Sequence, residues 1–264
     1  MERSILFFDI DGTILSEKTH EIPQSAMEAL HSAKKKGHLL FINTGRTLCG
    51  IPPELRRFPF DGYLCGCGTC LLYGDEVLFA HPLPKERGRK IIKKMFDCNV
   101  EGIAEGTEDN YLPERISRFE PLESTRRYFH RAGIGQEQYM ETGDFEYDKL
   151  FVYADEKSKT EEFFAFIAED MEVLERGRYA YEIIQKDFSK ATACAYMLKK
   201  FQIDKEHAYV FGDSSNDLSM FAYAGHAVAM GAHDPVLDIH TEFVTKNVED
   251  DGLYHALKQY GLIE

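Results

Sequence analysis

Asp9 follows directly on the apolar run of residues 5–8, and Asp11 comes after a single isoleucine, before the turn formers Gly12 and Thr13. A carboxylate is costly to remove from water unless it finds a partner. Acids two positions apart point to the same side of an extended strand, where they repel each other. The pair therefore either caps a following helix or forms an anionic site that holds a cation.

Two other strand-like segments also end in polar residues. Residues 38–43 run into Thr44 and Gly45, and residues 208–212 run into Asp213, with Asn216 and Asp217 close behind. Because the carboxyl ends of parallel strands share one rim of a sheet, these groups are expected to converge there. The converging set is Asp9, Asp11, Thr44, Asp213, Asn216 and Asp217.

Each polar residue also has an ordinary structural interpretation. Asp217 or Ser214 could cap the next helix, and Thr44 with Gly45 could form a plain turn. Lys190 could be a second cation of the site, but spacing alone favours a solvated lysine in the first turn of a helix. Because three predicted strands all end in polar residues, a common site is favoured.

Four carboxylates at one rim require positive charge. An all-oxygen ligand set without neighbouring His or Cys favours a hard cation, and Mg²⁺ is expected. One carboxylate of the opening pair, ionised at neutral pH because an unperturbed aspartate has a pKa of about 3.9, could attack phosphorus and form an aspartyl phosphate. The other could protonate the leaving oxygen and then activate water.

The elements that must position these residues alternate between strand and helix. The sequence predicts strands at 4–9, 38–46 and 63–68, a helix at 23–36 and a hairpin at 71–80. Later it predicts helices at 189–201 and 217–223, strands at 208–213, 226–231 and 243–247, and a closing helix. This alternation predicts an α/β fold with a doubly wound, Rossmann-like parallel sheet as its core.

The middle of the chain has a different pattern. A helix at 85–97 precedes an irregular polar stretch to about residue 146, and strands at 148–155 and 179–184 flank a helix at 157–170. Residues 82–184 are therefore interpreted as a second α+β unit inserted into the first. Residues 1–81 and 185–264 would form the core.

Four short motifs resemble those of the haloacid dehalogenase superfamily: DIDGT from Asp9, NTGR from Asn43, the lysine of FSK, and GDSSNDLSM from Gly212. Their order and separations are similar to those of its Cof-type phosphatases, in which a large α/β cap lies between the second and third motifs. This resemblance implies that the inserted α+β unit, residues 82–184, is a cap domain that selects substrate. Residues 224–236 and 249–257 also resemble that group. The resemblance covers residues 1–80 and 186–264.

This resemblance implies a role for each site residue. Asp9 would be the nucleophile, Asp11 the general acid/base, and Thr44 and Lys190 the groups that hold the phosphoryl group. Mg²⁺ would be bound by the Asp9 side chain, the Asp11 main-chain carbonyl and Asp213, with support from Asp217 and Asn216, and Gly45 and Arg46 would border the substrate. The chain departs from the family pattern at Cys67-Gly68 and Gly231-Ala232, where relatives carry Asn-Gly and Gly-Asn.

Composition and sequence patterns limit the partners and the location that are expected for the protein. The 264 residues are 44% hydrophobic and carry a net charge of −14, which argues against a nucleic-acid surface. No apolar run approaches the ~20 residues of a membrane span, and the N-terminus shows no signal-peptide pattern, so a cytoplasmic location is expected. Cys65, Cys67 and Cys70 are interpreted as small residues in a tight loop, because a structural zinc site needs four ligands.

The expected function is a Mg²⁺-dependent phosphatase that hydrolyses a small phosphorylated metabolite, such as a sugar phosphate, without nucleic acid, membrane or obligate protein partner. Two alternatives remain: phosphoryl transfer between metabolites, as in a phosphomutase, and a non-catalytic phospho-aspartate signalling or binding module. Four cap arginines could contact an anion, although a solvated surface is favoured for each: Arg115, Arg118, Arg126 and Arg127.

Overall fold

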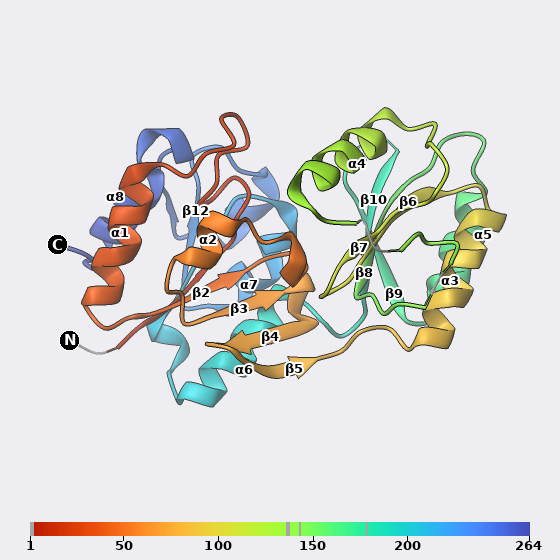
Figure 1. The fold of residues 1–264 in the computed structure, drawn as a ribbon. Coiled ribbons are helices and arrows are strands. Elements are labelled where there is room, and N and C mark those ends of the chain that lie inside the picture. The colour runs from red at the N-terminus through yellow and green to blue at the C-terminus, as the bar shows by residue number, and fades with distance from the viewer. Residues whose placement is uncertain (1–2, 136–137, 143, 178) are drawn as a thin grey trace. The chain divides into compact units, whose positions relative to one another are not determined.

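The computed structural model describes residues 3–135, 138–142, 144–177 and 179–264, and its chain divides into two compact units (Figure 1). The core unit comprises Met1–Gly45, Arg56–Phe79 and Phe188–Glu264. The cap unit comprises Arg46–Leu55 and Ala80–Asp187. The domain boundaries predicted from sequence remain a proposal, and this division differs from them chiefly in assigning residues 46–55 to the cap unit.

An eight-stranded sheet forms the core unit, in the order β13-β12-β11-β1-β2-β3-β4-β5. The parallel strands are β1 (Ile5–Phe8), β2 (Leu39–Asn43), β3 (Gly62–Cys65), β11 (Ala208–Gly212), β12 (His226–Ala229) and β13 (Phe243–Val244). β4 (Cys70–Tyr73) runs antiparallel to β3, and β5 (Glu76–Ala80) follows it at the edge. The prediction of a parallel-sheet core is confirmed.

Helices cover both faces of this sheet. Side chains of α6 (Lys190–Phe201) and α7 (Leu218–Tyr223) join a hydrophobic cluster with Ile5 and Phe7 of β1. α1 (Gln24–Lys35) and α8 (Gly252–Gln259) lie together on the other side, and the short α2 (Pro53–Arg57) follows β2 (Figure 1). All four residues of β1 are fully buried, as expected for a central parallel strand.

The cap unit is built on a five-stranded antiparallel sheet in the order β7-β6-β8-β10-β9. Its strands are β6 (Glu101–Glu105), β7 (Asn110–Tyr111), β8 (Lys149–Tyr153), β9 (Met171–Glu175) and β10 (Ala180–Gln185). The helices α3 (Lys85–Asp97) and α5 (Thr160–Ile167) pack on the face that carries Ala104 and Leu150. α4 (Glu120–Ala132) packs on the opposite face, against Ile103 and Leu112.

The predicted irregular stretch before residue 146 is wrong, because β6, β7 and α4 lie within it. Polar composition concealed these elements. β6 begins and ends with glutamates, and the buried Glu101 is paired with Arg115 and Arg118. α4 has only Leu122 and Phe129 as buried residues, which is too few for a clear helical pattern.

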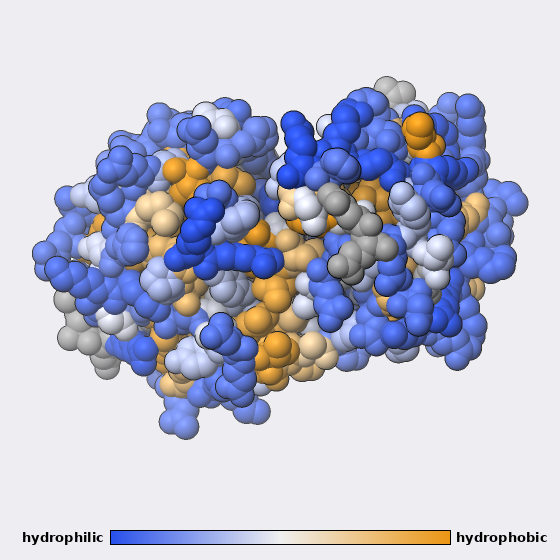
Figure 2. Space-filling model, viewed as in Figure 1, coloured by the Kyte–Doolittle hydropathy of each residue, from blue (hydrophilic) through white to orange (hydrophobic). Residues whose placement is uncertain are grey.

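The outer surface in the view of Figure 2 is mostly hydrophilic, with hydrophobic residues gathered over β3–β5 of the core unit. Val77 of β5 is 56% exposed. None of the helices that the structure describes is long and apolar enough to cross a membrane.

A buried ion cluster lies on the cap sheet and gives a testable pH dependence. Lys149 and Arg176 both donate to the carboxylate of Glu182, which is 4% exposed. Burial alone would raise the pKa of Glu182, but the two cations outweigh it and lower the pKa from 4.5 to about 2. Because the folded pKa is depressed, the stabilisation is complete above about pH 4.5 and is lost as the pH falls towards 2.

We therefore expect Glu182→Gln to lower the urea midpoint at pH 6 and to flatten its decline between pH 6 and pH 3, because the variant has no carboxylate to titrate. The exposed Glu175, on the neighbouring β9, provides the control Glu175→Gln with the same change of charge. Urea titrations at several pH values measure both effects. Equal pH slopes in wild type and Glu182→Gln would contradict the assignment.

Candidate active site

Asp9 lies immediately after β1, at the carboxyl edge of the core sheet. Its amide donates to the Phe211 carbonyl of β11 at 3.0 Å, so the ends of the two central strands are joined at this point. Its side chain is almost completely buried, with the residue 4% exposed. The Asp9 carboxylate, directly after β1, thus lies in the protein interior, where it requires a partner.

The turn after Asp9 packs closely against Asp213. Gly12 has a φ of +75°, and a Cβ there would lie 2.3 Å from Oδ2 of Asp213, so only glycine fits without displacement. The hydroxyl of Thr13 donates to Oδ1 of Asp213 at 2.9 Å. Asp11 is half-buried in this turn, and its backbone forms a bridge with Leu15.

Lys190 is the central cation of the site. It begins α6, behind the N-cap residue Ser189, and is only 1% exposed. Its Nζ donates to Oδ1 of Asp9 at 2.7 Å and to Oδ1 of Asp217 at 2.6 Å. A third hydrogen bond reaches Oδ1 of Asn216 at 3.1 Å. The interpretation of Lys190 as a solvated lysine, favoured by spacing alone, is therefore wrong.

Asp217 both caps the turn after β11 and contacts Lys190 in the site. Its Oδ2 accepts hydrogen bonds from the amides of Asp213 and Ser214, at 2.9 and 3.0 Å, in a capping box. Its Oδ1 accepts from Lys190, and the residue is fully buried. Both carboxylate oxygens are thus engaged, which fixes the loop after β11 and the lysine together.

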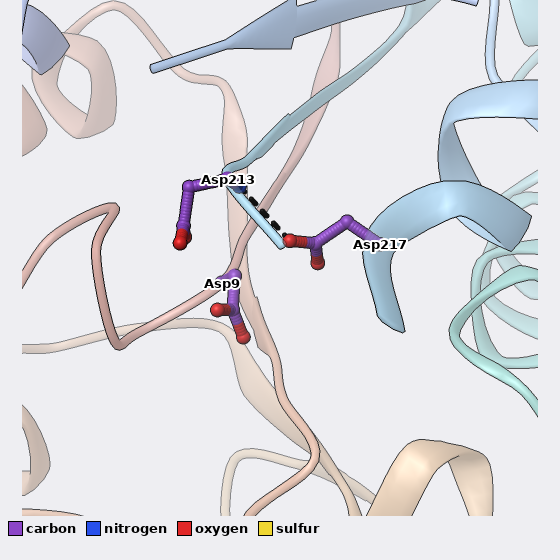
Figure 3. A group of neighbouring side chains, drawn as sticks. All are labelled: Asp9, Asp213 and Asp217. Atoms are coloured by element: carbon purple, nitrogen blue, oxygen red, sulfur yellow. Dashed lines mark hydrogen bonds between the residues drawn. The ribbon is translucent and has the colours of Figure 1, made fainter. Parts of the chain in front are cut away.

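Three carboxylates gather at this edge of the sheet (Figure 3). Each of Asp9, Asp213 and Asp217 offers an oxygen within 4.8 Å of the others, and among the described residues this is the group that could hold a metal ion. The Asp11 carboxylate is not a member of it. The structure therefore brings Asp9, Asp213, Asp217 and Asn216 of the predicted converging set together, and adds Lys190, which the strand-end pattern did not include.

Burial and mutual repulsion perturb two of these acids. Burial, in spite of Lys190 and with additional repulsion from Asp217, raises the pKa of Asp9 to about 7. Burial and repulsion from Asp9 raise the pKa of Asp213 to about 8. Burial opposes the charge of Lys190, but Asp217 and Asp9 outweigh it and raise its pKa. The cluster thus has more negative charge than one lysine neutralises, and a divalent cation would favour the ionised carboxylates.

Thr44 follows β2, the neighbour of β1 in the sheet, and is 1% exposed. Its amide donates to the Leu64 carbonyl and its carbonyl accepts from Cys67, which holds the turn after β2 against β3. Gly45 is buried behind it. Arg46 begins the 46–55 segment of the cap unit and donates to the Gly50 carbonyl at 2.8 Å.

Sequence reasoning missed Asn43. Its side chain is completely buried at the end of β2, and Nδ2 donates to the backbone carbonyl of Lys190 at 3.0 Å and contacts Sγ of Cys194 at 3.2 Å. Asn43 therefore positions the start of α6. A polar residue closing an otherwise apolar strand was the available signal.

The cysteine-rich turn supports the same helix. Cys67 has a φ of +57°, and a Cβ on Gly68 would lie 2.6 Å from the Ser189 carbonyl. Cys65 and Cys70 face each other across β3 and β4. Small residues thus allow this turn to pack against the helix that carries Lys190.

The four cap arginines form ion pairs with acids of the cap unit. Arg115 and Arg118 both contact Glu101, and Arg118 also pairs with Asp155. Arg126 pairs with Glu123, and Arg127 pairs with Glu120.

Comparison with known proteins agrees with this geometry. A model of haloacid dehalogenase-like hydrolases matches residues 6–257. The "Putative phosphatase YkrA" of Bacillus subtilis (strain 168) is 28% identical over 272 residues, covering 100% of both chains. The phosphoglycolate phosphatase of Methanobrevibacter smithii is 25% identical, covering 96% of this chain and 97% of its own.

Solved structures give the same result. The HAD subclass IIB sugar phosphatase BT4131 aligns with a TM-score of 0.81 and 27% identity, over 98% of this chain and 100% of that one. A Geobacillus kaustophilus protein has the same fold, with a TM-score of 0.85 at 24% identity over 99% of this chain and 100% of its own. The chain therefore belongs to the haloacid dehalogenase-like hydrolases, as a Cof-type phosphatase with an inserted cap.

Proposed function

We propose that the protein is a Mg²⁺-dependent phosphatase that hydrolyses small phosphorylated metabolites through an aspartyl-phosphate intermediate. The observation that carries this proposal is the buried contact of Lys190 with both Asp9 and Asp217, beside Asp213 at the ends of β1 and β11. A buried carboxylate held by a cation at a strand end is positioned as a nucleophile. The sugar phosphatase BT4131, which shares the fold across nearly the whole chain, supports the choice of small substrates.

The residues present fit a divalent cation. Both oxygens of Asp217 already accept hydrogen bonds, and Oδ1 of Asp213 accepts from Thr13. Asp9 and Asp213 therefore have the remaining carboxylate oxygens to coordinate the ion, together with the Asp11 carbonyl, while Asp217 holds their loop in place. When bound, Mg²⁺ would neutralise the charge on the phosphoryl oxygens.

In the proposed reaction, a carboxylate oxygen of Asp9 attacks phosphorus and the bond to the leaving oxygen breaks. Asp11 donates a proton to that oxygen, which releases an alcohol. Asp11 then accepts a proton from a water molecule that attacks the aspartyl phosphate, and phosphate and free Asp9 result. Lys190 and Thr44 hold the phosphoryl oxygens, and Asn216 orients Lys190.

We also propose that the protein is located in the cytoplasm. Its six cysteines are free in the structure, as is usual for proteins of a reducing compartment.

Metal removal tests the proposal directly. We expect phosphate release from a panel of phosphorylated metabolites in Mg²⁺, a loss of at least about 100-fold in chelator, and recovery when Mg²⁺ is restored, because the carboxylate cluster needs the ion's charge. Free phosphate and product isomers are measured together, since a phosphomutase would return an isomer. A phospho-aspartate that persists for hours without releasing phosphate would favour the signalling alternative.

A further inference from the structure

Residues 249–257, whose sequence resembles that of Cof-type phosphatases, have no role in the proposed reaction. They begin with a tight turn of the core unit. Nδ2 of Asn247 donates to Oδ2 of Asp250 at 2.9 Å, and the amide of Gly252 donates to the Asn247 carbonyl at 3.0 Å. The first residue of the motif, Glu249, therefore extends from a backbone that is fixed by its own hydrogen bonds.

The Glu249 side chain joins this turn to a distant part of the core unit. Its Oε1 accepts a hydrogen bond from the hydroxyl of Ser16, which is 233 positions earlier in the chain and 1% exposed. Its Oε2 lies 3.5 Å from the ammonium group of Lys18. The hydrogen bond from Ser16 lowers the pKa of Glu249, so the acceptor is a carboxylate at neutral pH. Hydrogen bonds to a charged acceptor are about twice as strong as neutral ones.

The hydroxyl of Ser16 has no other use for its proton. A serine hydroxyl offers one proton and two lone pairs. The oxygen accepts from the amides of Lys18 and Thr19, each at 3.1 Å, which occupies both lone pairs and leaves the proton for Glu249. The amide of Ser16 also donates to the Glu21 carbonyl at 3.0 Å. Ser16 thus joins the exposed loop that follows it to Glu249.

Ser16 also ends the turn that carries Asp11. The backbone of Asp11 forms a bridge with Leu15, the residue before Ser16. The amide of Gly12 donates to the Leu15 carbonyl, and the amide of Leu15 donates to the Ile10 carbonyl, both at 2.9 Å. Because these bonds close the turn, a displacement of Ser16 would also displace the backbone of Asp11.

We propose that Glu249, acting through Ser16, is a positioning residue for Asp11. The inference rests on the proposed function, in which Asp11 donates a proton to the leaving oxygen. Glu249 holds the Ser16 hydroxyl, and Ser16 fixes the end of the turn that carries Asp11. Proton transfer requires a separation of about 2.6–3.2 Å between the heavy atoms. Without the contact, Asp11 would occupy a wider range of positions and would meet this requirement less often.

The test compares phenyl phosphate with para-nitrophenyl phosphate, two esters of similar shape. The more basic phenolate depends on a proton from Asp11, whereas nitrophenolate leaves more readily without one. We expect Glu249→Ala to lower kcat/KM by at least about tenfold for phenyl phosphate and by less than about threefold for para-nitrophenyl phosphate. Glu249→Gln retains an acceptor for Ser16 and should keep the wild-type ratio. Glu206→Ala truncates an exposed glutamate elsewhere in the core unit and should change neither value.

A second variant tests whether Glu249 acts through Ser16. Ser16→Ala removes the same hydrogen bond and should lower the phenyl-to-nitrophenyl ratio at least as much as Glu249→Ala. If one hydrogen bond carries both effects, the double variant should have the ratio of Ser16→Ala alone. Reductions that multiply in the double variant would overturn the proposal.

The possible outcomes separate the two proposals. If wild type hydrolyses both esters and Glu249→Ala lowers neither rate, or lowers both equally, the positioning role is overturned and the phosphatase function stands. If wild type releases phosphate from neither ester in Mg²⁺, the phosphatase function fails and the inference fails with it. Thermal unfolding checks each variant. The Glu249 side chain is 31% exposed, so Glu249→Ala should fold, and its comparison with Glu249→Gln decides if Ser16→Ala does not fold.

Discussion

Asp9→Asn is expected to reduce phosphate release by at least about 1,000-fold while leaving the protein folded, since the amide cannot form the phospho-enzyme. The substitution is isosteric, and Lys190 keeps its contact with Asp217 at 2.6 Å. Loss of activity should therefore reflect chemistry and not collapse of the site. Steady-state release and acid-quenched labelling by a phosphate-labelled substrate measure the two consequences.

Labelling distinguishes the nucleophile from a residue that only binds. Wild type should carry label on the protein during turnover, and Asp9→Asn should carry none. The exposed Asp75, in the turn between β4 and β5, gives the matched control Asp75→Asn, which should behave as wild type. Labelled protein or near-normal turnover in Asp9→Asn would show that another group attacks phosphorus.

Lys190→Met is expected to lower both activity and stability. Methionine approximates the length of the side chain but removes the charge shared by Asp9, Asp217 and Asn216. Removing one partner of a buried ion pair typically costs about 3–5 kcal/mol, because the remaining charge is left uncompensated. We expect a loss of that order in the free energy of urea unfolding, and a drop in turnover of at least about 100-fold.

The control lies on the same helix. Lys199, in the last turn of α6, is exposed, so Lys199→Met removes the same charge without touching the site. Its unfolding and turnover should match those of wild type. If Lys190→Met were equally stable and active, the buried contacts of the lysine would have no role in either property.

The core of the fold was predictable because its strands are buried on both faces. Residues 5–8, for example, are uniformly apolar, and this pattern has few alternatives to a central strand. The cap was only partly predictable. β6 and α4 rely on glutamate–arginine pairs and a few apolar contacts, so their periodicity is weak in the sequence.

The candidate site was predictable in its members but not in its contacts. Strand ends identified Asp9, Asp213 and Asp217, since parallel strands must end at one rim. Lys190 could not be assigned from spacing, because its burial depends on the N-cap of α6 and on the support of Asn43 from β2. The contact between Asn43 and Lys190 joins residues 147 positions apart, so no local sequence pattern indicates it.

The division of the chain at Gly45–Arg46 has a consequence for the exchange of domains between relatives. The backbone passes between the two units at four places, after residues 45, 55, 79 and 187. A graft that exchanged only residues 80–187 would leave behind Thr47 and Cys49, the partners of Asn110 and Gly106. Chimaeras that exchange the cap unit should therefore carry residues 46–55 together with the larger insertion.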